Sequence, residues 1–167
     1  MLIIYTCYGG AHSSPMAAAI HLNRLVGAPL PSTKAIEGLL YFDIIDNEDR
    51  GRVFPVGIDE DGNRIYVLGR GSDERFIQQA IKSGYMLAGG DPRQVLFVNT
   101  LRAVNWQMRI GGFLSRRLGL VSLGRPLVAR GARRAYPQLT KIVRATKAHC
   151  RSVMGTRSPV SFPTNQE

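Results

Sequence analysis

Apolar and polar positions along the chain predict four short strands with helices between them. Runs rich in strand-forming residues occupy residues 2–5, 53–58, 64–68 and 95–98. The second and third runs flank an Asp-Gly turn, which predicts an antiparallel hairpin. Pro55 places the first strand of that hairpin at a sheet edge, because proline donates no ladder hydrogen bond. The last run is continuously apolar, as is typical of a buried parallel strand.

Apolar spacing and capping residues predict the helices. We expect a helix from Pro15 to residue 26 with Ser14 as its N-cap, a short helix over residues 33–40, and a helix over residues 73–82 capped by Ser72.

The chain after the last strand is expected to be helical and basic. Residues 101–118 form one amphipathic pattern in which Trp106 is expected to pack inward. A further helix is predicted from about residue 124 to residue 149, with Pro126 near its start and a kink at Pro137.

The order of these elements predicts an α/β fold. We expect a small, mostly parallel sheet with a β-hairpin, helices on both faces and a helical basic C-terminal region. Residues 1–152 are expected to form a single domain, and residues 153–167 a disordered tail rich in Ser, Pro and Thr. Parallel strands end at the same edge of a sheet, where ligands bind, so loops 7–14, 69–72 and 99–100 are expected to meet there.

The first of these loops combines a thiol with glycines and a helix N-terminus. Backbone N–H groups and the positive end of a helix attract an anion, and the same surroundings favour the thiolate of Cys7. We expect Cys7 to act as nucleophile and His12 as general acid or base. The expected anion-binding residues come from all three loops: Gly9, Gly10, Ser13, Ser14, Arg70, Ser72 and Asn99. The alternatives are that Cys7 is a buried structural thiol, that Gly9 and Gly10 only allow a tight turn, and that Arg70 is a surface charge.

The spacing Cys7-x-Gly9-x-x-x-x-Ser14-Pro15 resembles the signature of low-molecular-weight protein tyrosine phosphatases and of the arsenate reductases built like them. The resemblance implies that Cys7 is the nucleophile and that Ser14 stabilises its thiolate. Ser13 stands where that family has the arginine that clamps phosphate, so we expect Arg70 to supply the cation. Gly10 stands where the family has a loop asparagine. The family's general acid is the Asp of an Asp-Pro pair after the last strand, whereas Asp91-Pro92 precedes the last strand here.

Over its whole length, the chain resembles an uncharacterised bacterial family, a domain of unknown function. Segments 9–14, 66–71 and 109–119 carry this resemblance, which implies a shared fold and supplies no activity.

Charge is distributed unevenly along the chain. Residues 1–91 carry a net charge of −3, whereas residues 92–167 carry +13 and a single acidic residue, Glu167. This basic region predicts an anionic partner, either nucleic acid or an acidic membrane surface, unless it is only a solubilising face. Two cysteines and no apparent signal peptide favour a cytoplasmic protein, and no zinc-type spacing predicts a metal or other cofactor.

Two functions follow from these observations. The first is binding of a phosphate-like anion or phosphorylated ligand, with a degenerate or atypical thiol phosphatase-like activity. The alternative is a non-catalytic module that contacts an anionic partner through its arginine-rich helices. The sequence leaves open whether the protein is an enzyme.

Overall fold

The computed structural model describes residues 1–27, 29–116 and 118–155. Its four strands form one sheet in the order β2-β3-β1-β4. Their bounds are β1 Leu2–Cys7, β2 Val53–Ile58, β3 Arg64–Gly69 and β4 Val95–Asn99. Strand β1 pairs in parallel with both β3 and β4, and β2 completes the hairpin with β3. The expected α/β fold with a small, mostly parallel sheet is therefore confirmed.

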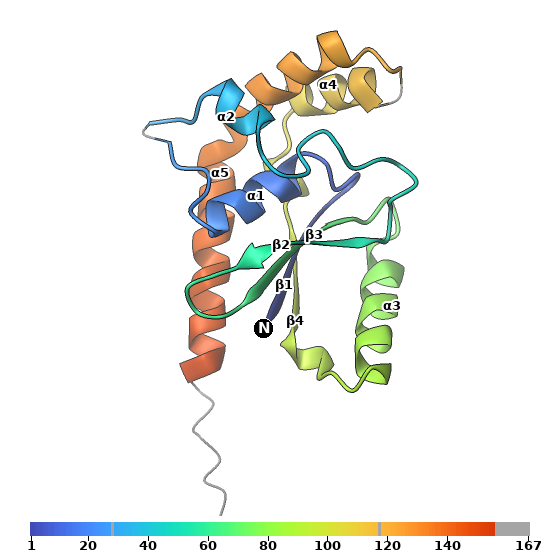
Figure 1. The fold of residues 1–167 in the computed structure, drawn as a ribbon, viewed down its shortest axis with the longest axis vertical. Coiled ribbons are helices and arrows are strands. Elements are labelled where there is room, and N and C mark those ends of the chain that lie inside the picture. The colour runs from blue at the N-terminus through green and yellow to red at the C-terminus, as the bar shows by residue number, and fades with distance from the viewer. Residues whose placement is uncertain (28, 117, 156–167) are drawn as a thin grey trace, which may run out of the picture.

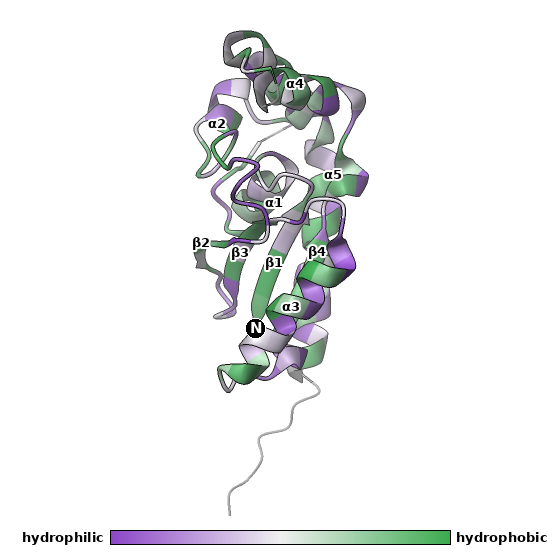
Figure 2. Ribbon diagram, turned by 90° about the vertical axis from the view of Figure 1, so that its right-hand side faces the viewer, coloured by the Kyte–Doolittle hydropathy of each residue, from purple (hydrophilic) through white to green (hydrophobic). Residues whose placement is uncertain are grey.

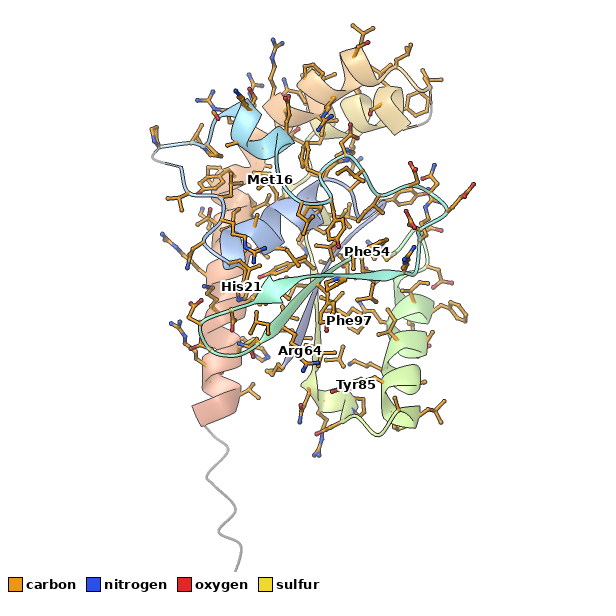
Figure 3. All side chains as sticks on the ribbon, viewed as in Figure 1. Met16, His21, Phe54, Arg64, Tyr85 and Phe97 are labelled. Atoms are coloured by element: carbon orange, nitrogen blue, oxygen red, sulfur yellow. The ribbon has the colours of Figure 1, made fainter. Side chains whose placement is uncertain are left out.

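Helices cover the two faces of the sheet unequally (Figure 1). The helices are α1 Ser13–His21, α2 Thr33–Glu37, α3 Glu74–Leu87, α4 Trp106–Arg116 and α5 Val121–Gly155, with short 3-10 turns η1 Pro92–Gln94 and η2 Leu101–Ala103. Helices α1 and α5 lie on one face, and α3 lies on the other. Figure 3 shows Met16 and His21 on the α1 side and Tyr85 and Phe97 on the α3 side.

Alternating side chains on the strands build two apolar clusters. On β1, Ile3 and Tyr5 join the larger cluster with α1 and α5, whereas Ile4 joins the smaller one beneath α3. This alternation follows from the two-residue repeat of a strand. The carboxyl ends of β1, β3 and β4 consequently share one edge, which is the arrangement expected from the sequence.

The first two helix boundaries differ from those predicted. Ser14 does not cap α1: the N-cap residue is His12, and α1 ends at His21, where Leu22 is its C-cap. Asn23 then adopts a positive φ of 55°, which a helix cannot continue through. Ser32 caps α2 as predicted, since its side chain accepts a hydrogen bond from Ala35 N, but the helix ends at Glu37 rather than at residue 40.

Side-chain caps also explain the later differences. Asp73, rather than Ser72, caps α3 by accepting from Phe76 N, and the helix continues to Leu87. Asn105 Oδ1 accepts from Met108 N at 3.1 Å, so the predicted helix over residues 101–118 is divided into η2 and α4. Trp106 is exposed rather than packed inward.

Helix α5 is longer than predicted. It begins at Val121 and continues to Gly155, with Pro126 and Pro137 inside it, and its axis changes direction along its length (Figure 1). Residues 153–155 of the predicted tail are therefore helical. The rest of that tail, residues 156–167, lies outside the described residues.

Candidate functional site

The loop after β1 is held against the loop after β3. Arg70 N donates to Cys7 O at 3.0 Å, and Gly71 N donates to Tyr8 O at 2.9 Å. Gly10, with φ +77°, lies so close to Gly69 that a Cβ on Gly10 would be 2.7 Å from Gly69 N. A side chain at either glycine would separate the two loops, so both glycines are needed for this close approach.

The Cys7 thiol lies at the end of β1 with two polar groups at its sulfur. Gly10 N donates to Sγ at 3.2 Å, and Ser14 Oγ lies 3.1 Å from Sγ. The Ser14 side chain thus contacts the thiol and does not cap α1. Donors directed at sulfur stabilise negative charge there. Cys7 is 4% exposed, and it forms part of a cavity wall.

His12 is oriented by a buried carboxylate. Its Nε2 atom lies 3.1 Å from Asp43 Oδ1, and Ser115 Oγ on α4 donates to the two Asp43 oxygens at 3.2 and 3.0 Å. Asp43 N donates to Ala11 O at 2.8 Å, so this segment is tied to the Cys7 loop through its backbone as well. A histidine held in this way keeps a fixed ring orientation, which a proton donor or acceptor requires.

The Ser13 hydroxyl is directed into the protein interior. Its Oγ lies 2.8 Å from Thr100 Oγ1, which donates to Thr6 O at 2.9 Å. Ser13 therefore links β1 to the segment after β4, and only its backbone N–H is left for an anion. Its side chain does not replace the arginine that the phosphatase signature has at this position.

The residues predicted from the other two loops lie elsewhere. Arg70 is held by Glu74, with Nη2 3.3 Å from Oε2, and by the carbonyl of Gly71. Asn99 Nδ2 donates to the same Glu74 carboxylate at 3.1 Å. Ser72 is exposed, and none of Arg70, Ser72 and Asn99 is among the residues that line the cavity at Cys7.

That cavity has a volume of about 490 Å³ and lies between the Cys7 loop, the segment after α2, and α4. The loop contributes Cys7, Tyr8, Gly9, Ala11, His12 and Ser13. Apolar side chains line the cavity as well: Ile45, Leu101, Val104, Met108 and Phe113. The cavity thus combines a thiol and a polar loop with apolar side chains.

Two cations that the sequence analysis did not select also line the cavity, namely Arg50 and Arg109. The Arg50 guanidinium lies over the Tyr8 ring, with Cζ 4.7 Å from the centroid, and donates to Asn47. Arg109 belongs to α4. Arg109 begins segment 109–119, which supplies no activity, and both arginines are far from Cys7 in the sequence, so their proximity to it was not predicted.

The loop also carries backbone donors at the cavity. Gly9, Ala11 and His12 all line it. Within the described part of the chain, their N–H groups donate to no protein acceptor. Ala11 is buried and Gly9 and His12 are half-buried, and a buried amide donor normally has a partner. An anion in the cavity would supply one.

The described residues bear on two other kinds of site. Among residues 1–27, 29–116 and 118–155, no group of three or more His, Cys, Asp or Glu side chains is placed to hold a metal ion. In the same ranges, no helix combines the length and apolarity that a membrane span requires.

Comparison with known proteins identifies a family and no activity. No curated protein and no solved structure matches the chain. A family model described as "Protein of unknown function (DUF3189)" matches residues 2–148, which include every strand and the loop around Cys7. The chain therefore belongs to the DUF3189 family of proteins of unknown function.

Proposed function

We propose that the cavity at Cys7 binds a phosphate-like oxyanion. The observation that carries this proposal is that the N–H groups of Gly9, Ala11 and His12, at the wall of the cavity, have no protein acceptor among the described residues. Gly10 N and Ser14 Oγ lie 3.2 and 3.1 Å from the Cys7 sulfur, so they hold the thiol beside these donors. Donors fixed in advance around one point are the usual means of holding an oxyanion.

Arg50 and Arg109 are the cations we assign to this anion. Both line the cavity, whereas Arg70 is paired with Glu74. Guanidinium groups bind phosphate through paired N–H donors, so two of them compensate for the serine at position 13.

Protection of Cys7 from alkylation tests the binding. In a Cys150→Ala background, iodoacetamide labelling of Cys7 is followed by mass spectrometry with and without inorganic phosphate. At ten times its Kd, phosphate should slow labelling about tenfold, because only unoccupied sites react. Unchanged labelling at all phosphate concentrations would contradict the proposal.

The arginines are tested in the same assay. Arg50→Gln and Arg109→Gln should each weaken phosphate protection roughly tenfold, because each loses a charge-assisted contact. Arg93→Gln is the matched control, since Arg93 is exposed and paired with Asp91 outside the cavity. Equal protection in all three variants would remove Arg50 and Arg109 from the site.

A second candidate function is phosphate ester cleavage. The Cys7 thiolate would attack phosphorus, forming an S–P bond while the P–O ester bond breaks, and the leaving oxygen would take a proton from His12. Water would then attack phosphorus and give a proton back to His12, while the S–P bond breaks to release phosphate and restore the Cys7 thiolate. The His12–Asp43 contact at 3.1 Å favours this candidate, because it orients a proton donor at the cavity.

Turnover of p-nitrophenyl phosphate separates the two candidates. A catalytic site should release nitrophenol in the wild type and lose that activity in Cys7→Ser and His12→Gln. Phosphate protection without turnover would indicate a binding module instead.

A further inference from the structure

Helix α4 carries an apolar stripe that faces solvent. Trp106, Ile110 and Phe113 are 61%, 47% and 49% exposed. Their spacing of four and three residues places them on one side of the helix. Three large apolar side chains on one exposed helix face differ from the scattered exposed residues of an ordinary surface.

Because α4 packs on α5 with its other face, this stripe faces solvent. Gly111 and Gly124 let the two helices approach closely: a Cβ on Gly111 would lie 2.7 Å from Val128 N, and one on Gly124 would lie 2.5 Å from Ser115 N. Met108 and Ser115 are buried. The opposite face therefore remains uncovered within the described chain.

The apolar surface continues into the connection to α5. Leu118, Leu120 and Leu123 are all exposed, and Leu118 N donates to Phe113 O at 3.3 Å. Figure 1 places α4 and the start of α5 together at one end of the molecule, and Figure 2 shows hydrophobic residues on α4 there. We call this surface, made of Trp106, Ile110, Phe113, Leu118, Leu120 and Leu123, the α4 tip.

The segment that carries the α4 tip is basic: residues 102–134 contain eight arginines and no acidic residue. Arg102, Arg109 and Arg130 are exposed, and Arg130 precedes Gly131, which packs against the start of α4. A partner that covers this end must therefore offer apolar area together with negative charge.

We propose that the α4 tip docks on an anionic membrane surface. A helix lying in the interface buries its apolar side chains at the acyl boundary while its arginines meet anionic headgroups, and tryptophan favours that depth. Nucleic acid fits less well, because contact with phosphates alone requires no exposed Trp, Ile and Leu cluster.

The docking goes beyond oxyanion binding and does not depend on Cys7. Phe113 and Arg109 line the cavity as well, so its opening adjoins the docked surface.

Trp106 reports on the docking directly, because it is the single tryptophan. Vesicles of phosphatidylglycerol should shift its emission to shorter wavelength and carry the full-length protein into the pellet on sedimentation. Vesicles of phosphatidylcholine should do neither, and added salt should reverse the binding. Absence of binding to phosphatidylglycerol would overturn the proposal.

A pair of variants tests the surface. Trp106→Ser/Ile110→Ser, at positions outside the cavity lining, should weaken sedimentation with phosphatidylglycerol at least about tenfold. Phe76→Ser/Leu87→Ser removes two comparably exposed apolar residues from α3 and should bind as the wild type does. Equal binding by both double variants would overturn the proposal.

The charge contribution is tested separately. Arg102→Gln/Arg130→Gln should weaken vesicle binding, whereas Arg75→Gln/Arg93→Gln, at exposed positions outside residues 102–134, should not.

Duplex DNA that binds more tightly than vesicles, or a dimer that forms through Trp106 and excludes vesicles, would each overturn the docking. Phosphate protection of Cys7 should be unchanged in every one of these variants, so failure of docking and failure of oxyanion binding are distinguishable.

Discussion

Tyr5, His21 and Asp59 form a buried hydrogen-bonded chain that takes no part in the cavity. Tyr5 Oη lies 2.7 Å from His21 Nδ1, and Asp59 Oδ2 lies 2.9 Å from His21 Nε2. A neutral imidazole satisfies both contacts, because Nε2–H donates to Asp59 and Nδ1 accepts from the Tyr5 hydroxyl. Burial lowers the pKa of His21, and the Asp59 hydrogen bond opposes this without reversing it.

The lowered pKa of His21 predicts acid-sensitive stability. The unfolded chain takes up a proton at His21 below about pH 6.5, whereas the folded chain resists it, so the free energy of unfolding should fall as pH drops. The slope from this group is at most about 1.4 kcal/mol per pH unit. Urea denaturation between pH 7.5 and 5.5 measures it, and His21→Asn should remove that part of the slope. An identical slope in the variant would contradict the assignment.

The contact between Gly69 and the Cys7 loop gives a second prediction. A Cβ at Gly69 would lie 2.7 Å from Gly9 C and O, so Gly69→Ala should displace the loop, cost about 1–3 kcal/mol and abolish phosphate protection of Cys7. Gly84→Ala, on α3 outside the cavity, meets no atom within 4 Å and is the control. Equal stability and equal protection in both variants, measured by urea denaturation and alkylation, would show that the contact does not shape the site.

The sequence predicted part of the candidate site because its signal is local. Cys7, Gly9 and His12 lie within one loop, and their spacing is visible in the sequence. Asp43 and Ser115 reach His12 from distant segments. Arg50 and Arg109 reach the cavity in the same way, so only tertiary packing brings these residues together.

At the scale of elements, the strands were easier to predict than the ends of the helices. Apolar runs and the Asp-Gly turn identify the strands, and parallel order follows from their connections. Helix ends depend on which of several possible residues acts as the cap. Asp73 caps α3 in place of Ser72, and the Ser14 hydroxyl contacts the Cys7 sulfur instead of capping α1. The outward position of Trp106 depends on how α4 packs on α5, which no local pattern encodes.

Two glycines in helices predict opposite effects of alanine. Gly84→Ala on α3 meets no atom within 4 Å and should stabilise the protein by about 0.5–1 kcal/mol through helix propensity. Gly124→Ala gains the same propensity, but its Cβ would lie 2.5 Å from Ser115 N and separate α5 from α4, so it should destabilise by about 1–3 kcal/mol. Thermal denaturation of the two variants compares them directly, and shifts of the same sign would contradict the helix contact.

At the scale of the whole molecule, α5 connects the parts of the fold. It packs against α1, α2 and α4. Several of its cations also bind acceptors in the N-terminal half: Arg125 to Glu37 O, Arg133 to Pro31 O, Lys147 to Glu60 and Arg151 to Asp61. Part of the basic charge thus makes intramolecular contacts, which the uneven charge distribution along the sequence did not predict.

A core substitution on α5 should therefore weaken the entire domain. Leu139 is fully buried, so Leu139→Ala should cost about 2–5 kcal/mol in a single unfolding transition. Glu60→Gln removes an exposed ion-pair partner and should change the midpoint little, because water and salt screen it. Circular dichroism during urea denaturation measures both variants. A Leu139→Ala transition in two steps would show that α5 does not join the domain into one cooperative unit.

Strand β1 lies inside the sheet between β3 and β4, and both of these partners come much later in the chain. Leu2 pairs with Arg64 on one side and with Val95 on the other. Closing such long loops slows folding, and until they close an apolar strand remains available to other chains. Recovery of native protein after dilution from denaturant should consequently decline as the protein concentration rises, since intermolecular strand pairing competes with the two distant partners.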